Sequence, residues 1–219
     1  FIITLGIALL LSLQPDIGQT LLVFFSWSVL IFTSGVSIFL LFFLFSSIFF
    51  IFFYLIFFVS KFTYIKNRLI SFLDSETGTY NFQSDKALES ITSGGFFGKG
   101  IGEGTLKNRV PEAHTDYIIS VISEEFGVIA IILIFLLFLV FIYSVFKKVN
   151  FENNETIKLI LVGSVSLILM QTIIHIGVNI RLFPTTGMTL PFISYGGSSI
   201  ISISILSGII LNFTKRNLN

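Results

Sequence analysis

The chain of 219 residues is 54% hydrophobic and 16% aromatic, and only 11% of its residues are charged. Soluble domains carry about 25% charged residues, so this composition excludes a water-soluble globule; it also excludes disorder, which needs low hydrophobicity and high charge. The net charge of +1 offers no polybasic surface for nucleic acid, and the absence of Cys excludes disulfides and thiolate metal sites. These properties are typical of a membrane protein.

The N-terminal half contains long apolar runs. Segment 1–13 is shorter than the ~20 residues that a membrane span needs, and loop-like residues 14–18 follow it, so we expect the end of a truncated helix, with a re-entrant piece as the alternative. A single helix over 20–59 would be about 60 Å long, roughly twice the hydrocarbon thickness of a bilayer. This run must therefore fold back, and Ser34-Gly35 is its turn-like dipeptide, which predicts spans over 20–34 and 36–59.

The rest of the chain alternates between polar and apolar segments. Further spans are predicted over 118–146, over 159–180 and from near 192 to 213, and the segments between them are a polar loop over 61–116, a turn over 147–158 and a Pro/Gly/Ser-rich loop over 181–199. We therefore predict an all-α polytopic membrane helix bundle. It would have about five spans plus a partial first one, in a single, N-terminally truncated membrane domain over 1–219.

The number of spans determines which loops share a side of the membrane. Loops 61–116 and 181–199 are expected on one side, and turn 147–158 and the tail after 213 on the other. Lys and Arg cluster close to spans on both sides, so the positive-inside rule does not decide the orientation.

A polar stripe marks the start of the predicted 118–146 helix. Four of its residues follow helical spacing and share one face: Asp116, Ser120, Ser123 and Glu124. One interpretation is a carboxylate base at the mouth of a water-accessible cavity. The other is a first-turn acid favoured by the helix dipole, with Thr115 as N-cap, which explains Asp116 but not Glu124 or Glu125, about two turns deeper.

A second stripe lies on the predicted 159–180 helix. Gln171, His175 and Asn179 are spaced i, i+4, i+8 and form one polar face. Hydrogen bonds between helices are the preferred interpretation, because Asn, Gln and His commonly make them in membrane bundles. A proton-carrying role for His175 is the weaker alternative.

Two glycine-rich segments have open roles. Segment 98–104 does not match the phosphate-loop pattern, because Gly100 follows Lys99 where Ser or Thr is required. We therefore expect a tightly turning segment. Its basic residues either bind an anionic head group or are solvated. Segment 194–199 joins a loop to a helix. It either presents backbone amides to an anion or caps the helix with Ser.

Several of these segments together resemble the signatures of a known family. Residues 110–117 with 124–127, and residues 184–199, are similar to two motifs of the SEDS family of bacterial shape, elongation, division and sporulation proteins, and 14–20 and 98–104 are similar to two more. The resemblance covers essentially the whole chain and implies the C-terminal part of a ten-span fold. Ala113 and Thr189 resemble the division member more than the elongation member.

The resemblance implies a peptidoglycan glycosyltransferase that polymerises lipid II outside the cytoplasmic membrane during septal wall synthesis. Asp116 matches the essential family Asp, the expected general base. The residues expected to bind substrate are Arg68, Lys99, Lys107, Arg109, His114, Glu124, Glu125, Ser194, Gly196, Gly197 and Ser198. No cofactor is assigned and no residue is named as a metal ligand, although a divalent ion remains an alternative to these cations at the leaving pyrophosphate.

The resemblance also implies partners and a location. The expected partners are a class B penicillin-binding protein transpeptidase and other divisome proteins, in the bacterial inner membrane at the division septum, with loop 61–116 extracytoplasmic. The alternatives are a lipid II flippase, an elongation-type polymerase, and an inactive fragment that serves as a scaffold.

Overall fold

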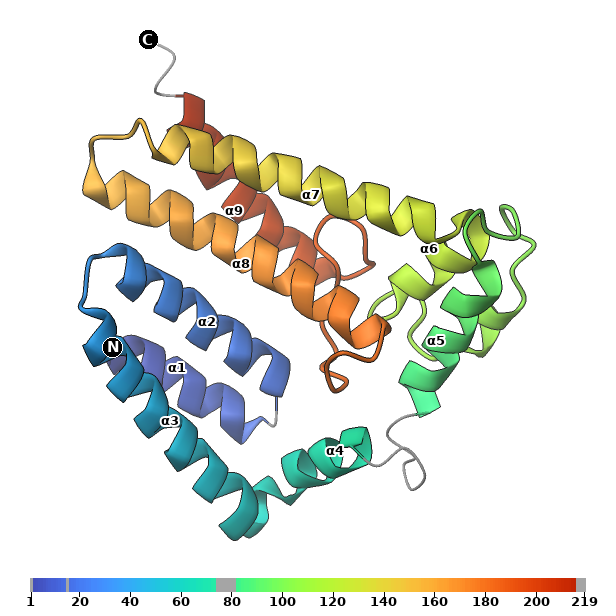
Figure 1. Ribbon diagram of the computed structural model, residues 1–219, viewed down its shortest axis with the longest axis horizontal. Helices are drawn as coiled ribbons and strands as arrows, with labels where there is room; N and C mark the ends of the chain where they lie inside the picture. Colours follow the sequence, from blue (N-terminus) through green and yellow to red (C-terminus); the bar gives the residue numbers. More distant parts are fainter. Residues whose placement is uncertain (1, 15, 74–81, 216–219) are drawn as a thin grey trace.

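The computed structural model describes residues 2–14, 16–73 and 82–215. Pro15 of the 14–20 motif, part of the predicted polar loop at 74–81 and Arg216 of the tail lie outside the described residues. The described residues form helices, turns and loops without a β-strand, so the all-α prediction is confirmed. The helices, shown in Figure 1, are α1 (Ile2–Leu13), α2 (Ile17–Thr33), α3 (Ile38–Phe58), α4 (Thr63–Leu73), α5 (Phe82–Gly94), α6 (Ile118–Phe126), α7 (Val128–Val149), α8 (Glu155–Asn179) and α9 (Gly197–Lys215), with short 3₁₀ turns η1 (Ser60–Phe62) and η2 (Leu106–Arg109).

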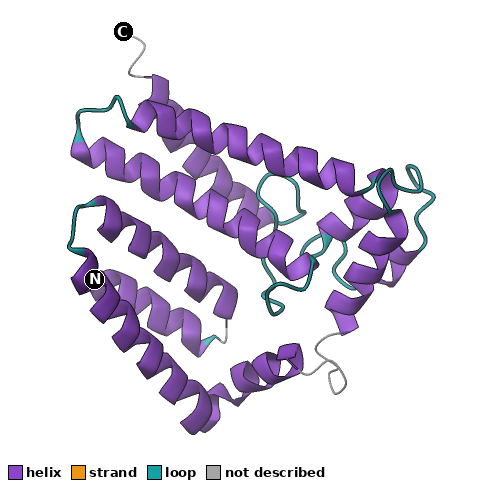
Figure 2. Cartoon of the chain, in the orientation of Figure 1, coloured by secondary structure: helices purple, strands orange, loops and turns teal. Residues whose placement is uncertain are grey.

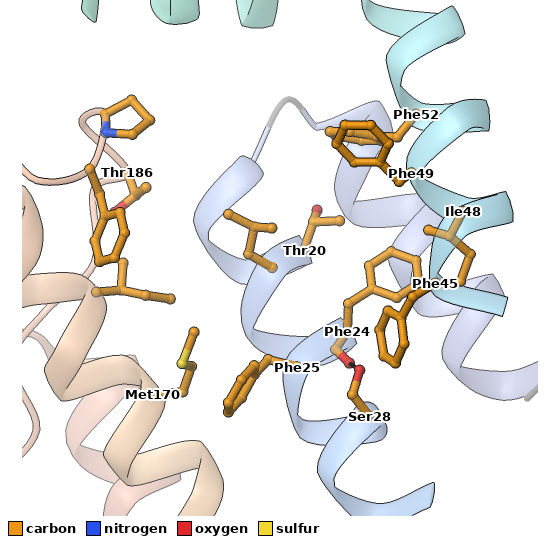
Figure 3. Close-up of a pocket in the computed structure, with 14 residues that line it drawn as sticks. Thr20, Phe24, Phe25, Ser28, Phe45, Ile48, Phe49, Phe52, Met170 and Thr186 are labelled. Carbon is orange, nitrogen blue, oxygen red and sulfur yellow. Dashed lines mark hydrogen bonds between the residues drawn. The ribbon is translucent and has the colours of Figure 1, made fainter. Parts of the chain in front are cut away.

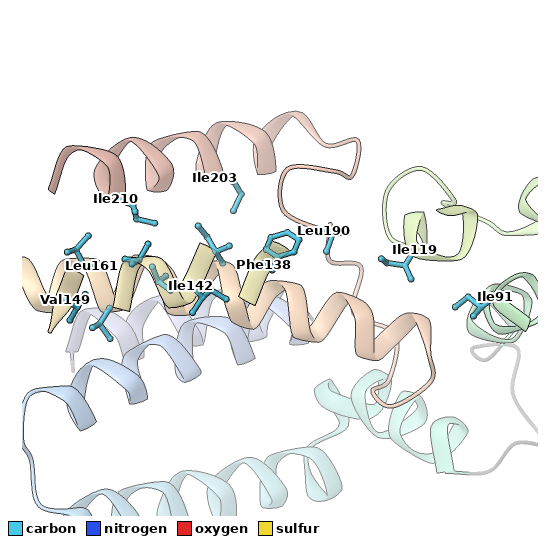
Figure 4. Close-up of a cluster of buried hydrophobic side chains, with 13 residues drawn as sticks. Ile91, Ile119, Phe138, Ile142, Val149, Leu161, Leu190, Ile203 and Ile210 are labelled. Carbon is cyan, nitrogen blue, oxygen red and sulfur yellow. The ribbon is translucent and has the colours of Figure 1, made fainter. Parts of the chain in front are cut away.

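Helix α8 is central to the bundle. It packs against α2 on one side and against α7 and α9 on the other, and its interior-facing residues include small ones such as Gly163, Ser164 and Ser166, which let neighbouring helices approach closely. Figure 4 shows the main apolar cluster extending from Val149 and Ile210 to Ile119 and Ile91. This cluster joins the long helices to the short ones that carry the site.

The outer helices expose apolar side chains. On α3, Phe39 is 85% exposed and Phe43 76% exposed, a surface suited to lipid and not to water. Among the described residues, α3, α7, α8 and α9 are long and apolar enough to cross a membrane. The remaining predicted span, over 20–34, corresponds to α2, which has 17 residues and is therefore about 26 Å long.

The reversal predicted at Ser34-Gly35 is confirmed. Helix α2 ends at Thr33, and Gly35 takes a left-handed backbone with φ of 80° before α3 begins at Ile38. The prediction that 118–146 forms one span is wrong, because Gly127, with φ of 81° and ψ of 174°, separates α6 from α7. The membrane-length helix therefore begins at Val128.

The ends of the last two spans also differ from expectation. Helix α8 begins at Glu155 and not at 159, because the side chain of Asn154 accepts hydrogen bonds from the N–H groups of Thr156 (3.0 Å) and Ile157 (3.4 Å). Helix α9 begins at Gly197 and not near 192, because Phe192 has a left-handed backbone, with φ of 66°, that is incompatible with a helix.

The predicted polar loop 61–116 is largely folded in its described part. It contains α4, α5 and η2, and α5 packs closely on α6. The buried face of α5 consists mainly of small residues, including Ser84, Ala87 and Ser90, so its sequence has little of the apolar periodicity that predicts a helix.

Loops gather at the two ends of the bundle, as Figure 2 shows. Turn 150–154 lies near the end of α9, where the ammonium group of Lys148 donates a hydrogen bond to the carbonyl of Thr214 (2.8 Å). The described parts of segment 61–116 and loop 181–196 lie at the opposite end (Figure 1). The two loops therefore share one end of the bundle, and their position on one side of a membrane stays a prediction.

Candidate functional site

Asp116 lies in a tight turn before α6. The carbonyl of Glu112, whose backbone is left-handed with φ of 53°, accepts hydrogen bonds from the N–H groups of Thr115 (3.1 Å), Asp116 (3.1 Å) and Tyr117 (3.2 Å). The N-cap of α6 is Tyr117 and not Thr115. Asp116 is therefore not on the helical face predicted for it.

Loop 181–196 holds this turn from the other side. The hydroxyl of Ser194 donates to the carbonyl of Thr115 (2.7 Å), and the N–H of Tyr195 donates to the carbonyl of His114 (3.0 Å). Ser194 also accepts a hydrogen bond from the N–H of Leu190 (2.8 Å). The two longest sequence motifs thus meet in space, and Ser194 holds the turn in place through its main chain.

The polar stripe on α8 fixes the same region. The side chain of Gln171 donates to the carbonyl of Thr189 (2.9 Å), and His175 Nδ1 lies 2.6 Å from the carbonyl oxygen of Met188. Asn179 donates to the carbonyl of Asp116 (3.0 Å). The expected partners were other helices, whereas these partners are carbonyl groups of the loop and the turn. Sequence analysis noted this stripe but did not connect Asn179 to Asp116.

The carboxylate of Asp116 lies beside Gly187. Gly187 has φ of 68°, and a Cβ atom there would lie 3.5 Å from Oδ2 of Asp116. Burial of the half-buried side chain raises the pKa of Asp116, and the negative charge of Glu112 raises it further. A carboxylate with a raised pKa is a stronger proton acceptor, which is the property required of a general base.

Glu124 does not face a water-accessible cavity, so that interpretation is wrong for this residue. Its side chain is fully buried. Burial alone would raise the pKa of Glu124, but the hydrogen bonds it receives outweigh that effect, and the pKa lies below its usual value. Its carboxylate accepts hydrogen bonds from the N–H groups of Thr105 (2.9 Å), Leu106 (3.0 Å) and Lys107 (2.7 Å), the hydroxyl of Ser90 (3.1 Å) and the ammonium group of Lys99 (3.3 Å). Glu124 therefore anchors segment 98–107 to α6.

Glu125 forms an ion pair with Lys107 and also accepts a hydrogen bond from the N–H of Gly102 (3.2 Å). The hydrogen bond from Lys107 lowers the pKa of Glu125. Glu125 and Lys107 line a pocket of about 670 Å³, together with Asn108, Val110, Glu112, Ala113, His114, Thr115, Val121 and Tyr195. Lys99 and Lys107, which were expected to bind an anionic head group, are thus paired with the acids of α6.

The remaining predicted residues lie at the same end of the bundle. Arg68 lies on α4 and donates a hydrogen bond to the carbonyl of Thr185 (2.8 Å), and Arg109 is exposed. Gly197 and Ser198 are exposed in the first turn of α9, and Gly196 lies against Thr189, whose methyl group would be 3.2 Å from a Cβ atom at this position.

An apolar pocket of about 370 Å³ lies beside loop 181–196 (Figure 3). Its walls come from α2, α3, α8 and segment 183–186. Gly18 of α2 permits this arrangement, because a Cβ atom there would lie 2.9 Å from both Met188 and Thr186. Sequence analysis did not identify this pocket, whose lining residues come from four separate parts of the chain.

The chain offers no evident ligand set for a divalent ion in the parts that the structure describes, since no group of three or more His, Asp or Glu side chains comes together there. We therefore assign no residue to a metal.

Comparisons with known proteins agree with the arrangement of these motifs. A family model described as a cell cycle protein family, FtsW/RodA/SpoVE, matches residues 1–219. The chain is 35% identical over 212 residues to the "Probable peptidoglycan glycosyltransferase FtsW" of Caulobacter vibrioides, covering 97% of this chain and 53% of that protein. It is 39% identical over 146 residues to the protein of the same name from Enterococcus hirae, covering 66% of this chain and 36% of that protein.

A solved structure is similar throughout. One chain of a peptidoglycan synthase complex, described as coordinating polymerization and crosslinking, matches with a TM-score of 0.80 and 26% identity, over 100% of this chain and 61% of that one. The chain thus spans about half the length of the Caulobacter relative.

Proposed function

Because the chain belongs to the FtsW/RodA/SpoVE family of cell cycle proteins, we propose that it is the catalytic part of a peptidoglycan glycosyltransferase that polymerises lipid II for septal wall synthesis. Its apolar helices make it part of a multi-pass membrane protein. The observation that carries the proposal is the carboxylate of Asp116, held in a turn by Asn179 and Ser194 and placed next to Gly187.

In this mechanism Asp116 is the general base. Its carboxylate takes the proton from the acceptor sugar hydroxyl while that oxygen bonds to the anomeric carbon of the growing strand. The bond from that carbon to the diphosphate oxygen breaks, and the electron pair leaves with the undecaprenyl diphosphate. General-base assistance contributes about 10²–10⁴-fold, and the raised pKa of Asp116 favours this role.

The proposal also includes the orientation of the chain in the membrane and its binding partners. The end of the bundle that carries Asp116 faces the outside of the inner membrane, at the division septum. The peptidoglycan synthase complex with a similar chain supports a transpeptidase partner of the class B penicillin-binding type, with other divisome proteins and lipid II as further partners.

The test is reconstitution of the full-length protein with its transpeptidase and labelled lipid II. Asp116→Asn should abolish glycan formation. Glu155→Gln is the matched control, because Glu155 is an exposed acid at the opposite end of the bundle, and it should polymerise normally. If Asp116→Asn polymerises as fast as the unmodified protein, the assignment of the base is wrong.

Reconstitution of the protein into lipid vesicles also distinguishes a polymerase from a transporter. A lipid II flippase would move the label across the bilayer without forming glycan, whereas the proposed enzyme forms glycan from lipid II presented at the outer face. A protein that does neither while correctly folded would be a scaffold.

A further inference from the structure

Four buried side-chain atoms in the described part of the chain have no hydrogen-bond partner: Nε2 of His175 and Oδ1 of Asn179 on α8, and Nε of Arg68 and Oγ1 of Thr186. The last two residues, Arg68 and Thr186, come close together, because another nitrogen of Arg68 donates a hydrogen bond to the carbonyl of Thr185, the neighbour of Thr186. Buried polar groups in native proteins are nearly always hydrogen-bonded, so two unpartnered groups at one place indicate a missing ligand.

The charge of Arg68 is also uncompensated within the described part of the chain. Lys99, Lys107 and Arg181 at the same end each pair with a carboxylate, whereas no described carboxylate lies within 4 Å of Arg68. The guanidinium group is held in place, since its carbon lies 4.5 Å from the ring centroid of Tyr64. A fixed guanidinium group that pairs with no described carboxylate is well suited to bind phosphate oxygens.

Thr186 connects this cation to the apolar pocket. Figure 3 shows Thr186 on one side of the pocket, with Phe45 and Phe49 on the other. The other hydroxyl groups in the lining belong to Thr20 and Ser28, and each donates to a carbonyl of its own helix. Among the side-chain hydroxyls of the described lining, that of Thr186 is therefore the one without a partner, at the edge of a largely hydrocarbon-like cavity.

We propose that Arg68 and Thr186 form the subsite for a diphosphate whose isoprenoid chain lies in the apolar pocket. The inference rests on the proposed function and adds the position of the leaving group. Nε of Arg68 and the hydroxyl of Thr186 donate hydrogen bonds to the diphosphate oxygens, and the aromatic and aliphatic walls contact the chain. A free diphosphate ion would satisfy the polar groups but leave the pocket empty.

The placement fits the geometry of the transfer. Thr186 is the sequence neighbour of Gly187, and a Cβ atom at Gly187 would lie 3.5 Å from Oδ2 of Asp116, so the proposed subsite lies near the proposed base. The anomeric carbon would then lie between the base and the leaving diphosphate. The positive charge of Arg68 stabilises the negative charge that develops on the diphosphate as the bond to carbon breaks.

Binding to the full-length protein in lipid nanodiscs tests this subsite without requiring polymerisation. Undecaprenyl diphosphate, undecaprenol and inorganic diphosphate are compared as probes. Arg68→Gln should weaken the binding of undecaprenyl diphosphate about tenfold or more, and the nearly isosteric Thr186→Val about fivefold, with undecaprenol binding unchanged. Lys158→Gln, a cation at the opposite end of the bundle, is the control and should bind all three as the unmodified protein does.

Two results would overturn the subsite. One is undiminished binding of undecaprenyl diphosphate by both Arg68→Gln and Thr186→Val. The other is an equal loss of diphosphate and alcohol binding in the Thr186→Val variant, which would indicate a change in shape. If the predicted binding pattern is found in a protein that makes no glycan, the subsite stands and the polymerase function fails.

Discussion

The side-chain amide of Asn179 joins the end of α8 to the main chain of Asp116. One N–H donates to the carbonyl of Asp116 at 3.0 Å and the other to the carbonyl of His175 at 2.9 Å. Asn179 is fully buried, so this contact is protected from water. The position of the proposed base is therefore fixed by a residue of α8 that lies 63 residues away from it in sequence.

Asn179→Ala should lower the turnover number of polymerisation by about tenfold or more, because a small displacement of a catalytic group strongly reduces the reaction rate. The Michaelis constant for lipid II should change little, since Asn179 does not contact the proposed lipid subsite. Asn150→Ala, an exposed residue in the turn after α7, is the control. Unchanged turnover in the Asn179 variant would show that this hydrogen bond does not position the base.

Glu112→Gln should move the acidic limb of the pH–rate profile to lower pH. The negative charge of Glu112 raises the pKa of Asp116, so its removal lowers that pKa, and the ionised base persists in more acidic solution. The measurement is kcat/KM against pH for the unmodified protein and the variant. Glu103→Gln, which removes an exposed acid from the Gly-rich segment, should leave the limb in place.

Glu124→Ala should lower the free energy of unfolding by about 3–5 kcal/mol, because it leaves Lys99 and several main-chain N–H groups without their buried acceptor. Thermal unfolding in detergent measures the change. The pKa of Glu124 is lowered by folding, so its stabilisation is complete above the unfolded-state pKa and is lost as the pH falls through the lower, folded-state value. Glu89→Gln, at an exposed ion pair, should barely change the melting temperature.

Gly187→Ala should reduce polymerisation with a modest loss of stability. The left-handed backbone at φ of 68° costs alanine about 1 kcal/mol, and relief of that strain would move the loop that lies against Asp116. Gly208→Ala provides the matched comparison, since a Cβ atom there meets nothing within 4 Å and alanine favours the helix. Equal activity of the two variants would contradict a role for the shape of this loop.

Apolar length and turn chemistry were sufficient to predict most of the membrane-crossing architecture. The break at Gly127 was not predicted, because a glycine inside a helical pattern is often tolerated and the polar residues Glu124 and Glu125 before it were interpreted as part of one continuous helix. Helix α5 was missed because its buried face has small and polar side chains that only the packing against α6 explains.

The candidate site was predicted less completely. The family resemblance predicts Asp116 as the base, whereas the contacts of Asn179 and Ser194 with the turn join distant segments, which periodicity cannot show. Spacing placed Glu124 on the polar face correctly, yet the acceptor role follows from the position of segment 98–107, which no local pattern determines.

The apolar pocket between α2 and α3 is bordered by side chains that face outward in this chain, among them Phe25 at 39% exposure and Phe49 at 65%. If this pocket holds the isoprenoid chain, as proposed above, the chain can enter sideways from the bilayer without passing through a tunnel. The rate of encounter would then depend on the density of the lipid-linked substrate in the leaflet and not on its concentration in water.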